Sequence, residues 1–206
     1  MTAGCNMLPM KAVLLEVSEA ELARRRRSGI DRWDEVWEGV LHMAPAPTDE
    51  HQRILDELIE FLRPLLRKSG RGILRSGINI FDEASPKENY RIPDLTFVRA
   101  SRTSVMKADG IRGGPPDAVI EVRSPSDETY EKLPFFARLG VSEVIVIDRD
   151  TKAVEVFRLA GGEYSLVAPD ASAAVTAATL EVTFRETSGG GLMVRDLRSE
   201  ETQSEI

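Results

Sequence analysis

The sequence predicts an α/β fold in which a mixed central β-sheet is flanked by helices. Residues 48–68 carry apolar side chains at helical spacing, whereas residues 71–123 break into short β-type runs separated by turns. The order helix, β-hairpin, helix, several strands, helix, two strands is typical of a sheet covered by helices. The 206 residues suffice for one domain with a substantial core.

The N-terminal part is predicted to form a helix and then a strand or hairpin. Ser18 and Glu21 have the spacing of a capping box, so a helix is expected to begin there and to end near Gly29. Its run of arginines, residues 24–27, is more typical of a solvated helix face than of a DNA-binding patch. Residues 35–43 alternate as a strand or hairpin does.

A long helix is predicted over residues 48–68, ending before Gly70, with a kink at Pro64. Its apolar face consists of isoleucine and leucine side chains: Ile54, Leu55, Leu58, Ile59, Leu62, Leu65 and Leu66. His51 lies on the same stripe as Leu55 and Leu58, so its ring is expected to face the protein interior.

Shorter elements follow the long helix. Residues 73–81 and 95–98 are predicted strands, and residues 102–116 form a loop rich in glycine and proline. Residues 118–122 are apolar except for Glu121, as expected of a central strand covered on both faces. The remaining predicted elements are a turn at residues 124–127 that leads into a helix ending at Gly140, strands at 144–147 and 154–159, and peripheral strands at 164–167 and 180–184.

A single domain is expected over residues 1–186, with its core at about residues 33–159. Residues 187–206 begin with a glycine run and become acidic. This composition favours a tail that is mobile or loosely packed.

The composition is that of an ordinary soluble globular protein, with 42% apolar and 30% charged residues. The sequence lacks an apolar run of membrane-spanning length and the succession of a signal peptide, which predicts a cytoplasmic location. One cysteine, Cys5, and two histidines cannot assemble a usual structural zinc site. The formal net charge of −7 argues against coating nucleic acid through bulk electrostatics.

Two acidic residues in strand-like runs, Asp94 and Glu121, are the strongest functional signal. A buried carboxylate is costly unless a cation or metal pairs with it. Oxygen ligands favour a hard ion such as Mg²⁺ or Mn²⁺, with Asp94, Glu121 and the carbonyl of Val122 as candidate ligands. Lys132, at the start of the next helical segment, is placed to stabilise charge on a phosphate. The pattern therefore predicts phosphodiester hydrolysis at a metal site.

Several phrases in the chain together resemble a known family. They are residues 37–41 (WEGVL), 50–52 (EHQ), 92–95 (IPDL), 121–126 (EVRSPS), 131–137 (EKLPFFA) and 140–148 (GVSEVIVID). In this order they resemble the Uma-type restriction endonucleases of the PD-(D/E)XK nuclease superfamily, over roughly residues 33–159. The resemblance implies a restriction-endonuclease-like core and a metal-dependent nuclease.

The resemblance also implies roles for single residues. Asp94 matches the motif aspartate and Glu121 the second acidic position, but Arg123 stands where the superfamily pattern has lysine. Lys132 matches a lysine recruited from the following helix, and His51 matches a family histidine. Glu50 beside His51, and with less support Glu38, are further candidates for the neighbourhood of the site.

The predicted function is therefore a Mg²⁺- or Mn²⁺-dependent endonuclease acting on nucleic acid, with DNA as the expected substrate. Asp94, Glu121, Lys132 and His51 are its predicted catalytic residues, and a homodimer or larger homo-oligomer is expected. A nuclease-fold protein with a regulatory or oligomerisation role is the main alternative, favoured by the acidic balance and by Arg123. A paired-carboxylate hydrolase acting on sugars is the third possibility.

Overall fold

The structure is a computed structural model that describes residues 17–43, 47–125, 127–199 and 201–206. Its contacts divide the chain into two units, Met1–Arg32 and Trp33–Ile206. One domain over residues 1–186 was expected from the sequence. The contacts instead separate residues 1–32 from the rest and extend the second unit to residue 206.

Helix α1 (Glu19–Ser28) forms the described part of the first unit, together with the start of the 3₁₀ helix η1 (Ile30–Trp33). The Ser18 hydroxyl accepts the backbone N–H of Glu21 at 3.2 Å, as the capping box predicts. Gly29 ends the helix in the left-handed region, at a φ of +68°.

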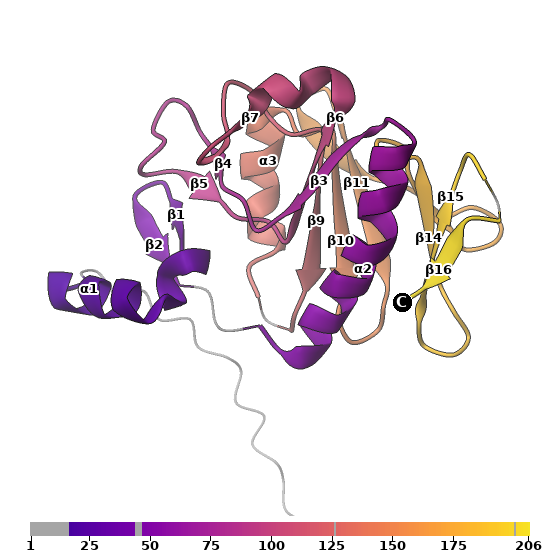
Figure 1. Cartoon of the computed structure of the whole chain (residues 1–206), viewed down its shortest axis with the longest axis horizontal. Helices are drawn as coiled ribbons and strands as arrows, with labels where there is room; N and C mark the ends of the chain where they lie inside the picture. The colour runs from indigo at the N-terminus through magenta and orange to yellow at the C-terminus, as the bar shows by residue number, and fades with distance from the viewer. Residues whose placement is uncertain (1–16, 44–46, 126, 200) are drawn as a thin grey trace, which may run out of the picture. The chain divides into compact units, whose positions relative to one another are not determined.

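The second unit is built on a six-stranded mixed sheet with the order β12-β11-β10-β9-β6-β3 (Figure 1). Its strands are β3 (Gly72–Ser76), β6 (Leu95–Arg99), β9 (Ala118–Arg123), β10 (Glu143–Asp148), β11 (Val154–Ala160) and β12 (Glu163–Leu166). Strands β9 and β10 are parallel, and the other neighbours are antiparallel. The buried run of β9 therefore lies inside the sheet, as its apolar sequence predicts.

Two helices cover opposite faces of this sheet. Helix α2 (Asp49–Lys68) packs in one core cluster with Ala118, Ile120 and Val122 of β9. Helix α3 (Leu133–Leu139), which follows the 3₁₀ helix η3 (Tyr130–Lys132), packs in a second cluster with Val119. Successive side chains of β9 therefore point alternately to the sheet face that α2 covers and to the face that α3 covers. Helix α2 continues through Pro64.

A second sheet has the order β2-β1-β5-β4-β8-β7. Its short strands are β1 (Glu35–Trp37), β2 (Val40–His42), β4 (Ile80–Phe81), β5 (Tyr90–Arg91), β7 (Met106–Lys107) and β8 (Gly110–Ile111), and the 3₁₀ helix η2 (Ala100–Val105) precedes β7. The single strand predicted over 73–81 is divided between the two sheets. Gly77 lies at the division with a φ of +56°, and a Cβ there would stand 2.3 Å from the ring of Trp33.

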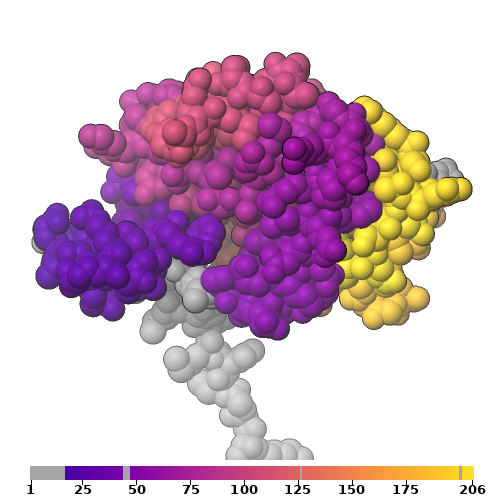
Figure 2. Space-filling model, in the orientation of Figure 1, coloured from indigo at the N-terminus to yellow at the C-terminus, as the bar shows by residue number. Residues whose placement is uncertain are grey.

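The C-terminal residues form a third sheet with the order β13-β14-β15-β16. Its strands are β13 (Val175–Ala177), β14 (Val182–Glu186), β15 (Leu192–Asp196) and β16 (Gln203–Glu205). Leu192, Val194 and Ile206 are buried in the same core cluster as helix α2, and Figure 2 shows the yellow C-terminal strands beside that helix. The expectation of a mobile or loosely packed tail is therefore wrong for residues 187–199 and 201–206. The backbone of β15 pairs with β14, and its alternating apolar side chains, Leu192 and Val194, enter the core.

Buried charges join this third sheet to the rest of the second unit. Arg71 forms an ion pair with Asp196, and both side chains are almost fully buried. Glu143, at the start of β10, accepts the backbone N–H groups of Ala178 and Thr179 at 3.1 and 2.6 Å. Such buried carboxylates are stable only with partners of this kind.

Candidate active site

The register of the central sheet brings Asp94 and Glu121 together. Strand β6 pairs with β9 so that Leu95 lies opposite Ile120, and Asp94 and Glu121 are the next residues along the two segments. The contact is fixed by Asp94 Oδ2, which accepts the backbone N–H of Val122 at 2.7 Å.

Glu121 points to the sheet face that carries α3. It lies two residues after Val119, on the same face of β9, and Val119 belongs to the core cluster of that helix. The Glu121 side chain is only 5% exposed. Lys132 lies where η3 meets α3, and its Nζ is 3.1 Å from Glu121 Oε1. The structure therefore brings together the predicted carboxylate and the predicted lysine.

A third carboxylate, Glu35 of strand β1, completes this group and was missed by the sequence analysis. Glu35 Oε1 lies 3.0 Å from Lys132 Nζ, and the side chain is 8% exposed. The same carboxylate accepts the backbone N–H of Ile92 at 2.8 Å and the indole N–H of Trp37 at 2.6 Å. Its position within an alternating hairpin gave no sign of this burial.

Two carboxylates, those of Glu121 and Glu35, contact the ammonium group of Lys132, and the charge of Asp94 also acts on it. Burial raises the pKa of Glu121; the charge of Lys132 opposes the rise, whereas those of Asp94 and Glu35 add to it. Burial alone would lower the pKa of Lys132, but the charges of Glu121 and Glu35 outweigh it and raise the pKa. Lys132 therefore stays charged, whereas Glu121 holds a proton more readily than a free carboxyl group does.

His51 lies in the first turn of α2, where Thr48 caps the helix by accepting the His51 N–H at 3.3 Å. Its Nε2 is 3.2 Å from Asp94 Oδ1. Burial would lower the pKa of His51, but the hydrogen bond and charge of Asp94, with the charge of Asp127, raise it. The predicted histidine therefore contacts the predicted aspartate.

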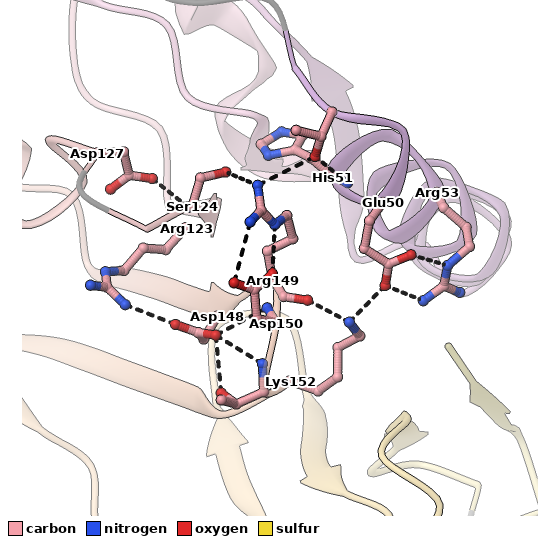
Figure 3. A network of polar contacts seen from close by, with 12 residues as sticks. Glu50, His51, Arg53, Arg123, Ser124, Asp127, Asp148, Arg149, Asp150 and Lys152 are labelled. Atoms are coloured by element: carbon pink, nitrogen blue, oxygen red, sulfur yellow. Dashed lines mark hydrogen bonds and ion pairs between the residues drawn. The ribbon is translucent and has the colours of Figure 1, made fainter. Parts of the chain in front are cut away.

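Other candidate residues lie elsewhere or have other partners. Glu50 is directed to Arg53 and to Lys152, whose Nζ is 2.7 Å from Glu50 Oε1 (Figure 3). Arg123, at the place of the motif lysine, instead binds Asp148 at 2.8 Å. Glu50 is therefore engaged in a surface ion-pair network.

Glu38 also lies apart from the carboxylate group. Its side chain is 71% exposed, and its oxygen is 3.7 Å from Arg138. The structure does not bring Glu38 to the site.

The donor set at Asp94 and Glu121 suits a hard divalent cation. The carbonyl of Arg123 accepts the N–H of Arg149 on the β10 side, so the carbonyl of Val122 points to the opposite edge, toward Asp94. In residues 17–43, 47–125, 127–199 and 201–206, no group of three or more His, Cys, Asp or Glu side chains is arranged to hold a metal. Mg²⁺ needs only one or two protein carboxylates because it keeps several waters. Two carboxylates and one carbonyl therefore fit this ion.

The mixed sheet, with carboxylates at adjoining strands and a lysine from the helical segment that follows β9, defines a nuclease-like α/β protein of the restriction-endonuclease type. The Uma2 family model, described as "Putative restriction endonuclease", matches residues 22–187, and the chain belongs to this family. A comparison with curated proteins gave no match.

A solved structure has a similar fold. It is described as "a putative nuclease belonging to DUF820" from Anabaena variabilis, and it is 19% identical in sequence, with a TM-score of 0.57. The match covers 71% of this chain and 82% of the other. In the described part of the chain, every helix is too short or too polar to span a membrane.

Proposed function

We propose that this chain is a Mg²⁺- or Mn²⁺-dependent endonuclease that hydrolyses phosphodiester bonds in DNA. The main support is geometric: Glu121 and Glu35 share the ammonium group of Lys132, and Asp94 is hydrogen-bonded to the backbone of the strand that carries Glu121. Family membership supports nuclease chemistry in general. The choice of metal and of DNA belongs to this proposal.

Asp94, Glu121 and the carbonyl of Val122 would hold the ion. When bound, such an ion lowers the pKa of water and neutralises charge on the phosphate. Hydrolysis forms one bond from a water oxygen to phosphorus and breaks one ester P–O bond, and the leaving oxygen gains a proton. Positioning of the ligands and stabilisation of the developing charge are assigned to side chains of the protein.

Lys132 supplies a fixed positive charge beside Glu121, where it stabilises the negative charge that develops on the phosphate oxygens. The backbone N–H of Val122 and the ring of His51 hold the two oxygens of Asp94. His51 therefore orients Asp94, and it is placed to contact the water or the phosphate. Cleavage of both strands of a duplex would require two such sites, which is the reason to expect a homodimer.

Cleavage of supercoiled plasmid with added Mg²⁺ or Mn²⁺ tests the proposal. We expect the wild type to nick or linearise the plasmid, and Asp94→Ala and Glu121→Ala to be inactive. Glu50→Gln is a matched control, because it removes a carboxylate that is engaged by Arg53 and Lys152. Cleavage that survives both alanine substitutions would remove the proposed site. Absence of cleavage with either metal would favour the non-catalytic alternative.

A further inference from the structure

We infer that the β1–β2 hairpin is a positioning device for Lys132, and that Glu35 is the residue through which it acts. The inference rests on the proposed nuclease function and adds to it a residue from outside the central sheet. It follows from the contacts of Glu35, from a second contact of the hairpin, and from the charge balance around Lys132.

Glu35 is held rigidly by donors on both of its oxygens. Oε1 accepts the backbone N–H of Ile92 and contacts Lys132 Nζ, while Oε2 accepts the indole N–H of Trp37. A side chain that is 8% exposed and fixed in this way has little freedom to move. Glu35 therefore gives the amine of Lys132 a fixed second acceptor.

The hairpin contacts the segment that carries Lys132 at a second point. The ring of Trp37 stacks on His42 of β2 with centroids 3.9 Å apart and an interplanar angle of 15°. His42 Nδ1 lies 2.7 Å from Glu128 Oε2, four residues before Lys132 in the chain. Glu35 and His42 thus hold the same segment from both ends.

The hairpin itself is anchored beside the site. Val36 pairs with Tyr90 of β5, and its carbonyl accepts a guanidinium N–H of Arg91 at 3.0 Å. The Arg91 guanidinium lies between the rings of Trp37 and Phe135, 4.3 and 4.2 Å from their centroids. Phe135 belongs to α3, so this stack connects the hairpin to the helix that Lys132 precedes.

The amine of Lys132 and a bound cation would compete for the carboxylate of Glu121. Because Lys132 is shared between two carboxylates, the amine would keep Glu35 as an acceptor if Glu121 helped to hold a cation. Without the charge of Glu35, the amine would pair with Glu121 alone and compete more strongly with the cation. The same change would remove one negative charge from the neighbourhood of the ion. Both effects weaken cation binding, and a displaced Lys132 also lowers kcat.

The test compares Glu35→Gln with Glu38→Gln in the full chain. Both substitutions replace a glutamate of the same hairpin, but Glu38 is exposed and lies apart from Lys132. Mn²⁺ affinity is measured by calorimetry, cleavage of plasmid by kcat and KM, and folding by thermal unfolding. We expect Glu35→Gln to lower Mn²⁺ affinity and kcat by about 10-fold or more, as for other residues that orient a metal site, with little change in KM. Glu38→Gln should match the wild type, and Glu35→Asp, which keeps the charge, should recover part of the loss.

The outcomes separate this inference from the proposed function. A wild type that cleaves DNA while Glu35→Gln matches Glu38→Gln in affinity and kcat overturns the positioning role alone. A wild type that neither binds Mn²⁺ nor cleaves overturns the proposed function and this inference with it. If Glu35→Gln does not fold, Trp37→Phe is measured, because it removes the indole donor to Glu35 and keeps an aromatic ring beside His42 and Arg91. A kcat for that variant equal to that of Glu38→Gln would also overturn the positioning role.

Discussion

The carboxylate of Asp94 accepts the backbone N–H of Val122 at 2.7 Å, which joins the end of β6 to the strand that carries Glu121. This bond allows the charge of Asp94 to be separated from its structural role. Asp94→Asn keeps an acceptor for the Val122 N–H and loses the charge, whereas Asp94→Ala loses both. We expect both variants to lose cleavage, and the alanine variant alone to lose about 1 kcal/mol in the free energy of unfolding. Urea unfolding and plasmid cleavage measure the two effects, and wild-type cleavage by Asp94→Asn would contradict this assignment.

Lys132 is predicted to stabilise the fold as well as to act on the phosphate. Lys132→Met leaves Glu121 and Glu35 buried without their cation, which costs about 3–5 kcal/mol for a broken buried pair. The loss is smaller when Glu121 takes up a proton. The double variant Glu121→Gln/Lys132→Met should therefore lose less than the sum of the single variants, as urea unfolding would show. A Lys132→Met variant as stable as the wild type would show that the buried pair contributes nothing.

The C-terminal strands are predicted to be necessary for folding. Deleting residues 187–206 removes β15 and β16 and exposes core that Leu192, Val194 and Ile206 cover. It also leaves Arg71 buried without Asp196. We expect the shortened chain to be insoluble or to lack a cooperative thermal transition. A shortened chain that melts at the wild-type temperature would restore the expectation of a loosely packed tail.

Glu50 provides a pH-dependent control outside the site. Its contacts with Arg53 and then Lys152 lower its pKa from 4.5 to about 2. Because the folded pKa is depressed, the stabilisation is present above pH 4.5 and is lost as the pH falls through about 2. Glu50→Gln should be slightly less stable than the wild type near neutral pH, and the difference should disappear in acid. Chemical unfolding over this pH range, with 1 M salt as a further arm, measures it; a difference that grows in acid would contradict the ion pairs.

Two carboxylates of the candidate site, Asp94 and Glu121, could be predicted from the sequence because they stand beside or within apolar runs that are expected to be buried. Glu121 interrupts an otherwise apolar strand, and a charged residue in that place requires a partner. The apolar pattern indicated the strands that follow Asp94 and carry Glu121, but their antiparallel pairing comes from the structure. The order of elements predicted the sheet and its two helices.

Glu35 was not predictable in the same way. Its hairpin alternates as an exposed hairpin does, and its burial depends on contacts with Ile92 and Lys132, which lie far along the chain. Glu50 was a candidate because it is next to His51 in the sequence. Successive residues of a helix point in different directions, and Glu50 contacts Arg53 and Lys152 instead. Strands β15 and β16 of the C-terminal sheet were missed because few apolar residues stand between a glycine run and an acidic end, whereas the strand predicted at 180–184 overlaps β14. Whether such a segment forms strands depends on pairing with other strands, and local composition does not predict that pairing.

Calorimetric titration of Mn²⁺ into the wild type, Asp94→Ala and Glu121→Ala tests the shared cation site most directly. We expect the wild type to bind one ion per chain, and each substitution to lower the affinity by about 10-fold or more. Equal binding by all three proteins, or no binding by the wild type, would contradict a cation site between Asp94 and Glu121.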